Sequence, residues 1–209
     1  SQPELKHRWH EAHEIGHNII PWHEGAMLGD DRFTLNQNCH DQVEAEANFA
    51  ASRLLFLRDR FTVEARDHAP SIEAVRALKP VFGNTYTTTF WRSIETWGVS
   101  VPIVGMISDH PHPARRSAEF DPANPCEHFV RSPAFAAGFS GVGEVEVFGF
   151  VSGYCQPRRA GPLGEAEIVL TDDNGDAHVF RFESFSNSYQ ALTLGVYQRP
   201  YAPLVRFGT

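Results

Sequence analysis

His13-Glu14-Ile15-Gly16-His17 lies near the start of the chain. It is an HExxH pattern within Leu5 to Ile20, a segment whose composition favours a helix. Residues four apart lie on the same face of a helix, so the two imidazoles can bind one metal ion. Glu14 is displaced by about 100° around the helix, so it can act on a metal-bound water without binding the metal. The pattern predicts a catalytic zinc site with His13 and His17 as ligands and Glu14 as general base.

A catalytic zinc ion needs a third protein ligand and an open fourth position. The residues after the motif offer five candidates: His23, Cys39, His40, Glu44 and Glu46. Gln42 to Phe61 is rich in Ala and Leu, lacks Gly and Pro, and is predicted to form one long helix. Glu44 and Glu46 would point about 200° apart on it, so only one of them can face the histidine pair. Asn48, one turn after Glu44, could accept a hydrogen bond from a ligand histidine and fix its tautomer.

The two motifs together resemble the ImmA/IrrE family of zinc peptidases. That family combines H-E-x-G-H with a later segment similar to Glu44-Ala45-Glu46-Ala47-Asn48-Phe49-Ala50-Ala51-Ser52-Arg53-Leu54-Leu55 of this chain. The resemblance, which spans about Leu5 to Trp97, implies that His13, His17 and Glu44 bind zinc and that Glu14 is the base. It also implies a specific protein substrate, such as a transcriptional repressor or an antitoxin, in stress or mobile-element regulation.

The chain departs from the family pattern at several positions. Ala50 replaces a usual Phe, Phe56-Leu57 replaces a usual Met-Pro, and Pro21 stands where many members continue the zinc helix. Family members also carry a helix and strands before the zinc helix, which help to shape the substrate groove. This sequence begins at Ser1 and reaches the motif without such a segment, and it does not indicate whether the chain is a truncated or processed form.

The composition argues against several classes of protein. The net charge of −8 argues against a broad nucleic-acid interface, which needs clustered basic residues. No stretch has the roughly 20 apolar residues of a membrane helix, and the first residues are too polar for a signal peptide. Three cysteines without a C-x-x-C pair favour a reducing compartment. We therefore expect a cytoplasmic protein that does not enter the membrane; the sequence does not indicate its oligomeric state.

The remaining patterns predict an α+β fold, with a helical zinc-peptidase unit over residues 1–98 and a β-rich unit of unassigned role over 99–209. Loops are predicted at His23–Asp41 and at the Pro-rich segment His110–Pro125. Helices are predicted at Ser71–Leu78, capped by Ser71 and ended before Pro80, and at Thr87–Trp97. Strands are predicted at Val99–Ile107, Glu144–Tyr154, Glu165–Thr171, His178–Phe185 and Ala191–Tyr197, with a hairpin turn at Asp172-Asp173-Asn174-Gly175.

A second interpretation is a regulatory module whose zinc site is structural or vestigial and which acts by binding protein or DNA. Ser71–Leu78 and Thr87–Trp97, joined by a Gly83-Asn84 turn, have the spacing of a helix-turn-helix. The acidic net charge favours core packing over DNA contact for Phe90, Trp91 and Trp97. A complete set of zinc ligands and base favours the peptidase.

Overall fold

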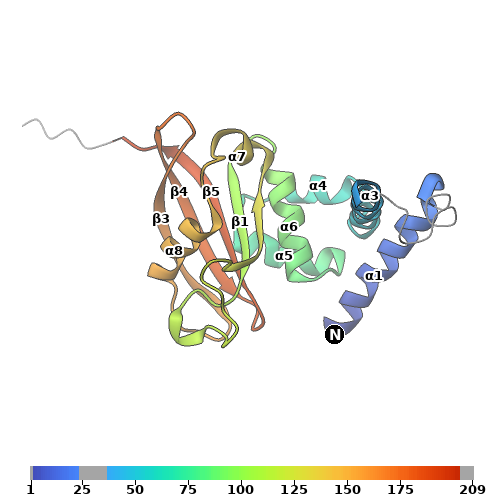
Figure 1. Cartoon of the computed structure of the whole chain (residues 1–209), viewed down its shortest axis with the longest axis horizontal. Helices are drawn as coiled ribbons and strands as arrows, with labels where there is room; N and C mark the ends of the chain where they lie inside the picture. Colours follow the sequence, from blue (N-terminus) through green and yellow to red (C-terminus); the bar gives the residue numbers. More distant parts are fainter. Residues whose placement is uncertain (1, 24–36, 203–209) are drawn as a thin grey trace, which may run out of the picture. The chain divides into compact units, whose positions relative to one another are not determined.

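The computed structural model describes residues 2–23 and 37–202 (Figure 1). The fold is α+β, with helices in the N-terminal part and an antiparallel sheet in the C-terminal part, as the sequence predicts. The chain divides into two compact units, which we name the helical unit (residues 1–67 and 78–85) and the sheet unit (residues 68–77 and 86–209). Within the described residues, no helix combines the length and apolar character needed to cross a membrane.

The helical unit contains α1 (Gln2–Ile19), α3 (Gln37–Leu55), α4 (Arg60–Arg66) and the end of α5 (Ile72–Phe82). Its apolar core includes the rings of Phe56, Phe61 and Phe82, whose centroids lie 4.7 to 6.0 Å apart. The loop predicted from His23 to Asp41 lies mostly outside the described residues, and α3 already begins at Gln37.

The single long helix predicted for Gln42–Phe61 is wrong, because the structure has two helices there. Leu57 and Arg58 adopt positive φ angles of 52° and 58°, which end α3 before α4 begins. The Arg58 N–H donates to the Arg53 carbonyl at 2.8 Å and so closes the end of α3. Neither residue is a glycine, so helix propensity does not reveal this break.

Helix α5 begins as predicted and ends later than predicted. The Ser71 hydroxyl accepts a hydrogen bond from Ala74 N–H at 3.1 Å, which confirms its capping role. Pro80 lies inside the helix, which continues to Phe82 and ends at Gly83, where φ is +61°. A proline in the last turn removes only one backbone hydrogen bond, so this short helix tolerates it.

The sheet unit is built on five antiparallel strands in the order β2-β1-β5-β4-β3. Their bounds are β1 (Ile103–Ser108), β2 (Cys126–Arg131), β3 (Gly161–Thr171), β4 (Ala177–Ser186) and β5 (Ala191–Pro200). Strand β1 lies between β2 and β5, and its Val104 is aligned with Arg131 of β2 and with Gly195 of β5. The predicted turn joins β3 to β4, and Gly175 has the positive φ of +89° that such a turn requires. The segment His110–Pro125 is irregular except for a short 3-10 helix, η1 (Pro113–Arg115).

Helices cover both faces of this sheet (Figure 1). On one face, α6 (Tyr86–Trp97) packs so closely on β1 that a Cβ at Gly105 would lie 2.1 Å from Ile94 Cδ1. On the other face, Val104 and Met106 pack in one cluster with residues of α7 (Pro133–Gly138) and α8 (Glu144–Tyr154). Because neighbouring strand residues alternate between faces, all six residues of β1 are buried. Helix α6 therefore belongs to the sheet unit, and the division differs from the one expected at residue 98.

The strand predicted at Glu144–Tyr154 is wrong, because these residues form helix α8. Val147, Phe148 and Val151 are buried at helical spacing, whereas Val145 and Phe150 are exposed. Two acidic residues in the first turn also suit the positive end of a helix dipole. The patterns above did not predict β2 or α7; Ser132 caps α7 by accepting from Phe135 N–H at 3.2 Å.

Candidate metal centre

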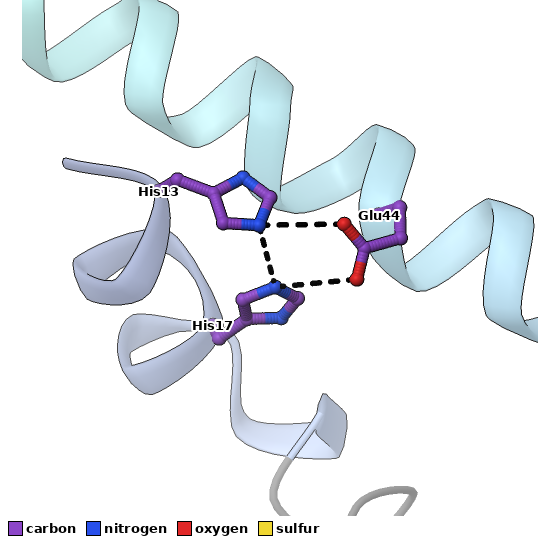
Figure 2. Close-up of side chains that lie close together, drawn as sticks. All are labelled: His13, His17 and Glu44. Carbon is purple, nitrogen blue, oxygen red and sulfur yellow. Dashed lines mark hydrogen bonds and ion pairs between the residues drawn. The ribbon is translucent and has the colours of Figure 1, made fainter. Parts of the chain in front are cut away.

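Three side chains of the helical unit meet between α1 and α3. His13 and His17 lie one turn apart on α1, and Glu44 faces both of them from α3 (Figure 2). The Nε2 atoms of the two histidines are 3.0 Å apart. Glu44 Oε2 lies 3.3 Å from His13 Nε2, and Glu44 Oε1 lies 3.7 Å from His17 Nε2. Two donors that each lie about 2 Å from one ion are at most about 4 Å apart, so these spacings fit a single metal ion.

The close approach of the two helices depends on Gly16. A Cβ at this position would lie 2.7 Å from the backbone oxygen of Ala47, so only glycine fits without a shift of the backbone. Ala47 and Ala51, on the same side of α3, are fully buried and small. This contact brings Glu44, three residues before Ala47, within reach of the histidines.

His13 is held in the tautomer that a metal ligand needs. Its Nδ1 lies 3.1 Å from Asn48 Oδ1, one turn beyond Glu44 on α3. An amide oxygen only accepts, so Nδ1 carries the proton and donates it to Asn48. The lone pair of Nε2 therefore points at Glu44 and His17. The contact with Asn48 is the one that the sequence analysis expects between this residue and a ligand histidine.

His17 contacts a further histidine behind it. Its Nδ1 lies 3.2 Å from Nδ1 of His23, which is completely buried. The other ring nitrogen of His23, Nε2, lies 3.3 Å from Glu46 Oε2. Of the candidates for third ligand, His23 thus reaches His17 through the nitrogen that faces away from the metal centre.

Glu46, whose side chain is 36% exposed, has its own set of partners. It accepts hydrogen bonds from Trp22 Nε1 and Gln42 Nε2, each at 2.9 Å, while Arg53 pairs with Asp59. The bond from Gln42, with those from Trp22 and His23, lowers the pKa of Glu46, so it is a carboxylate at neutral pH. Neither Cys39 nor the exposed His40 belongs to the metal-binding group.

Burial lowers the pKa of His17, and the neighbouring His13 adds to this effect, whereas Glu44 opposes it. Its imidazole is therefore neutral at ordinary pH, which is the form that binds metal. Two Nε2 lone pairs and a carboxylate directed at one point repel one another unless a positive charge lies between them. The chemistry of the three donors, as well as their spacing, therefore fits a metal cation.

Glu14, the expected base, is exposed on α1 beside the metal centre. Its charge raises the pKa of His17, against the larger effect of burial, which lowers it. Within residues 2–23 and 37–202, His13, His17 and Glu44 form the one group that could hold a metal ion. That leaves coordination positions for other ligands, as a catalytic centre requires.

The sheet unit has a hollow of about 270 Å³, lined by Asp109, His110, Arg115, Arg159, Ser186, Ser188, Tyr189, Gln190 and Ala191. This volume is below the roughly 300–1,000 Å³ of typical small-molecule sites. Arg115 and His110 contact backbone carbonyls: Arg115 donates to Pro157, and His110 Nε2 lies 2.9 Å from the Arg158 oxygen. The metal centre of the helical unit is therefore the stronger candidate site.

Comparison with known proteins does not assign a family. No family model matches the chain, and no curated protein matches it. Among solved structures, a Mycobacterium tuberculosis transcriptional regulator aligns with 96% of this chain over 69% of its own length, at 10% identity and a TM-score of 0.40. A likeness at that level supports no conclusion about activity.

Proposed function

We propose that the chain is a zinc-dependent endopeptidase that cleaves a specific protein substrate. The observation that supports this best is the convergence of His13 Nε2, His17 Nε2 and Glu44 on one point. The spacing matches zinc coordination, and nitrogen and carboxylate donors are those that zinc prefers. The paired motifs, which resemble the ImmA/IrrE zinc peptidases, give the proposal its reaction class.

In this proposal the chain's own residues have separate tasks. His13, His17 and Glu44 hold zinc, which when bound supplies a Lewis acid and a more acidic water. Glu14 accepts a proton from the attacking water on a carboxylate oxygen and then passes it to the leaving amide nitrogen. Asn48 holds the His13 ring in place throughout. The substrate we propose is a transcriptional repressor or antitoxin, and the chain acts in the cytoplasm.

A first experiment tests the metal. Purified protein is expected to hold about one zinc per chain, and the double variant of His13→Ala and His17→Ala should hold none. Elemental analysis after dialysis measures both. Zinc retained in equal amount by the double variant would refute the proposal at its base.

A second experiment tests the chemistry. Wild type and Glu14→Gln are incubated with a library of peptides derived from a proteome, and new termini are identified by mass spectrometry. Glu14→Gln is nearly isosteric but is a poor proton acceptor, so it should keep zinc and lose cleavage. Equal cleavage by both proteins would exclude Glu14 as the base.

A third experiment, on the zinc-loaded wild-type protein, tests the alternative of a regulatory module with a structural zinc. A structural site has four protein ligands, whereas the described residues offer three. X-ray absorption of the zinc-loaded protein should therefore show a water-derived oxygen beside two imidazoles and a carboxylate. A fourth protein ligand, together with no cleavage of any peptide, would favour the regulatory module.

A further inference from the structure

We infer that His23 is a positioning residue: held by Glu46, it fixes His17 in the tautomer that presents Nε2 to the metal. This inference rests on the proposed metal site and gives the second carboxylate of the Glu44-Ala45-Glu46 segment a task of its own. Glu44 binds the metal directly, while Glu46 acts on it through two imidazoles.

The direction of each hydrogen bond follows from Trp22. An indole N–H only donates, so Glu46 Oε2, 2.9 Å from Trp22 Nε1, is an acceptor. The same oxygen lies 3.3 Å from His23 Nε2, which must then carry a proton and donate it. In a neutral His23 the other nitrogen, Nδ1, is left with a lone pair.

The tautomer of His23 determines that of His17. The Nδ1 atoms of His17 and His23, 3.2 Å apart and turned away from the metal centre, are joined by one proton, and since His23 accepts, His17 donates. The Nε2 atoms of His13 and His17, 3.0 Å apart, have the metal cation between them in that role. The Nδ1 of His17 is therefore protonated, and its Nε2 carries the lone pair. That lone pair points to the same place as those of His13 Nε2 and the Glu44 carboxylate.

The hydrogen bond between His17 and His23 is buried, so water cannot easily take the place of either partner. His23 is 0% exposed and the His17 side chain 9%, so water has little access to the bond between them. Asn48, which has the equivalent role for His13, is exposed, so water can take its place there. We therefore expect the hydrogen bond from His17 to His23 to contribute more to zinc affinity than the hydrogen bond from His13 to Asn48.

The tautomers can be measured directly in the wild-type protein. Long-range ¹H–¹⁵N NMR of the imidazoles distinguishes Nδ1–H from Nε2–H in both metal-free and zinc-loaded protein. We expect Nδ1–H on His17, and Nε2–H with a bare Nδ1 on His23. An Nε2–H tautomer of His17 in the metal-free protein, or a doubly protonated His23, would overturn the inference. This readout decides it even if the wild type binds no zinc, an outcome that refutes only the proposed function.

Zinc affinity gives a second, independent test. His23→Leu removes both hydrogen bonds and should weaken zinc binding by about 10- to 100-fold, the usual effect of losing such a partner. His23→Gln, whose amide can donate and accept, should recover part of the loss. Asn48→Ala should weaken binding less than His23→Leu, and the exposed His40→Leu serves as a control. Wild-type affinity in both His23 variants would overturn the inference; should His23→Leu not fold, His23→Gln and the NMR measurement still decide it.

Discussion

Replacing Gly16 with alanine should damage the metal centre without touching any of its donor atoms. The new Cβ would lie 2.7 Å from the Ala47 oxygen, whereas ordinary contact begins at 3.4 Å. The difference, roughly 0.7 Å, is the distance by which α1 and α3 must separate at this point if the contact is to become ordinary. Metal sites tolerate deviations of only about 0.2 Å in ligand distance. Glu44 lies close to the displaced contact and should lose its fit to the histidines.

Overpacking of this kind costs about 1–3 kcal/mol, and alanine returns up to about 1 kcal/mol of helix propensity. We therefore expect the free energy of unfolding of metal-free Gly16→Ala to fall by about 0–3 kcal/mol. Zinc binding to the variant has to bring the ligands back to their proper distances. If this costs about 1.4 kcal/mol, zinc affinity falls tenfold. Competition with a zinc chelator measures the affinity, and thermal unfolding measures the stability.

Gly149→Ala in α8 is the matched control, because a Cβ there meets nothing within 4 Å. It should leave zinc affinity unchanged and raise stability by about 0.5–1 kcal/mol. If Gly16→Ala binds zinc as tightly as the wild type, the close contact between α1 and α3 does not set the ligand geometry.

Three further predictions follow from other parts of the chain. Glu44→Ala should weaken zinc binding, measured by calorimetry, far more than Glu46→Ala, because only Glu44 reaches both imidazoles; the reverse order would contradict the assignment. The hydrogen bond from Ser140 N–H lowers the pKa of Asp173, so this carboxylate stabilises the sheet unit above its ordinary pKa and loses that effect as pH falls through the lowered one. Asp173→Ala should thus lower the melting temperature at about pH 7 but not at about pH 2, and a constant difference would count against it. Phe180→Ala should cost about 3–5 kcal/mol in chemical denaturation, since this ring is fully buried among other aromatic rings; a loss below about 1 kcal/mol would mean that the core is not packed as described.

Local chemistry was sufficient to predict much of the fold. Helix α1 and the β3–β4 hairpin follow from composition and from turn residues, which act over a few positions. Helix α8 was missed because Glu-Val-Glu-Val alternates like a strand, while burial of Phe148 beside Val147 is decided by the sheet on which the helix packs. The break after α3 depends on two left-handed residues, which no local preference indicates.

Part of the candidate site can also be predicted from the sequence, and part cannot. That His13 and His17 share a face, and that Glu44 and Glu46 point apart, follows from helix geometry alone. The contact of His23 with His17 does not, because the chain has to turn after α1 and bring His23 back beneath it. The available signal was Glu46, a carboxylate on the opposite side of α3 from Glu44, which needs donors of its own if it is partly buried.

The course of α5 has a consequence for how this chain can be dissected. Its first residues belong to the sheet unit and its last to the helical unit, so the chain passes between the units after residues 67, 77 and 85. A fragment of residues 1–67 would lose Phe82, which packs on Phe56 and Phe61, and Asn84, whose side chain donates to the Leu55 carbonyl at 3.3 Å. The metal centre therefore cannot be moved to another protein as one continuous segment. Residues 78–85 would have to be joined to residues 1–67 by a designed linker.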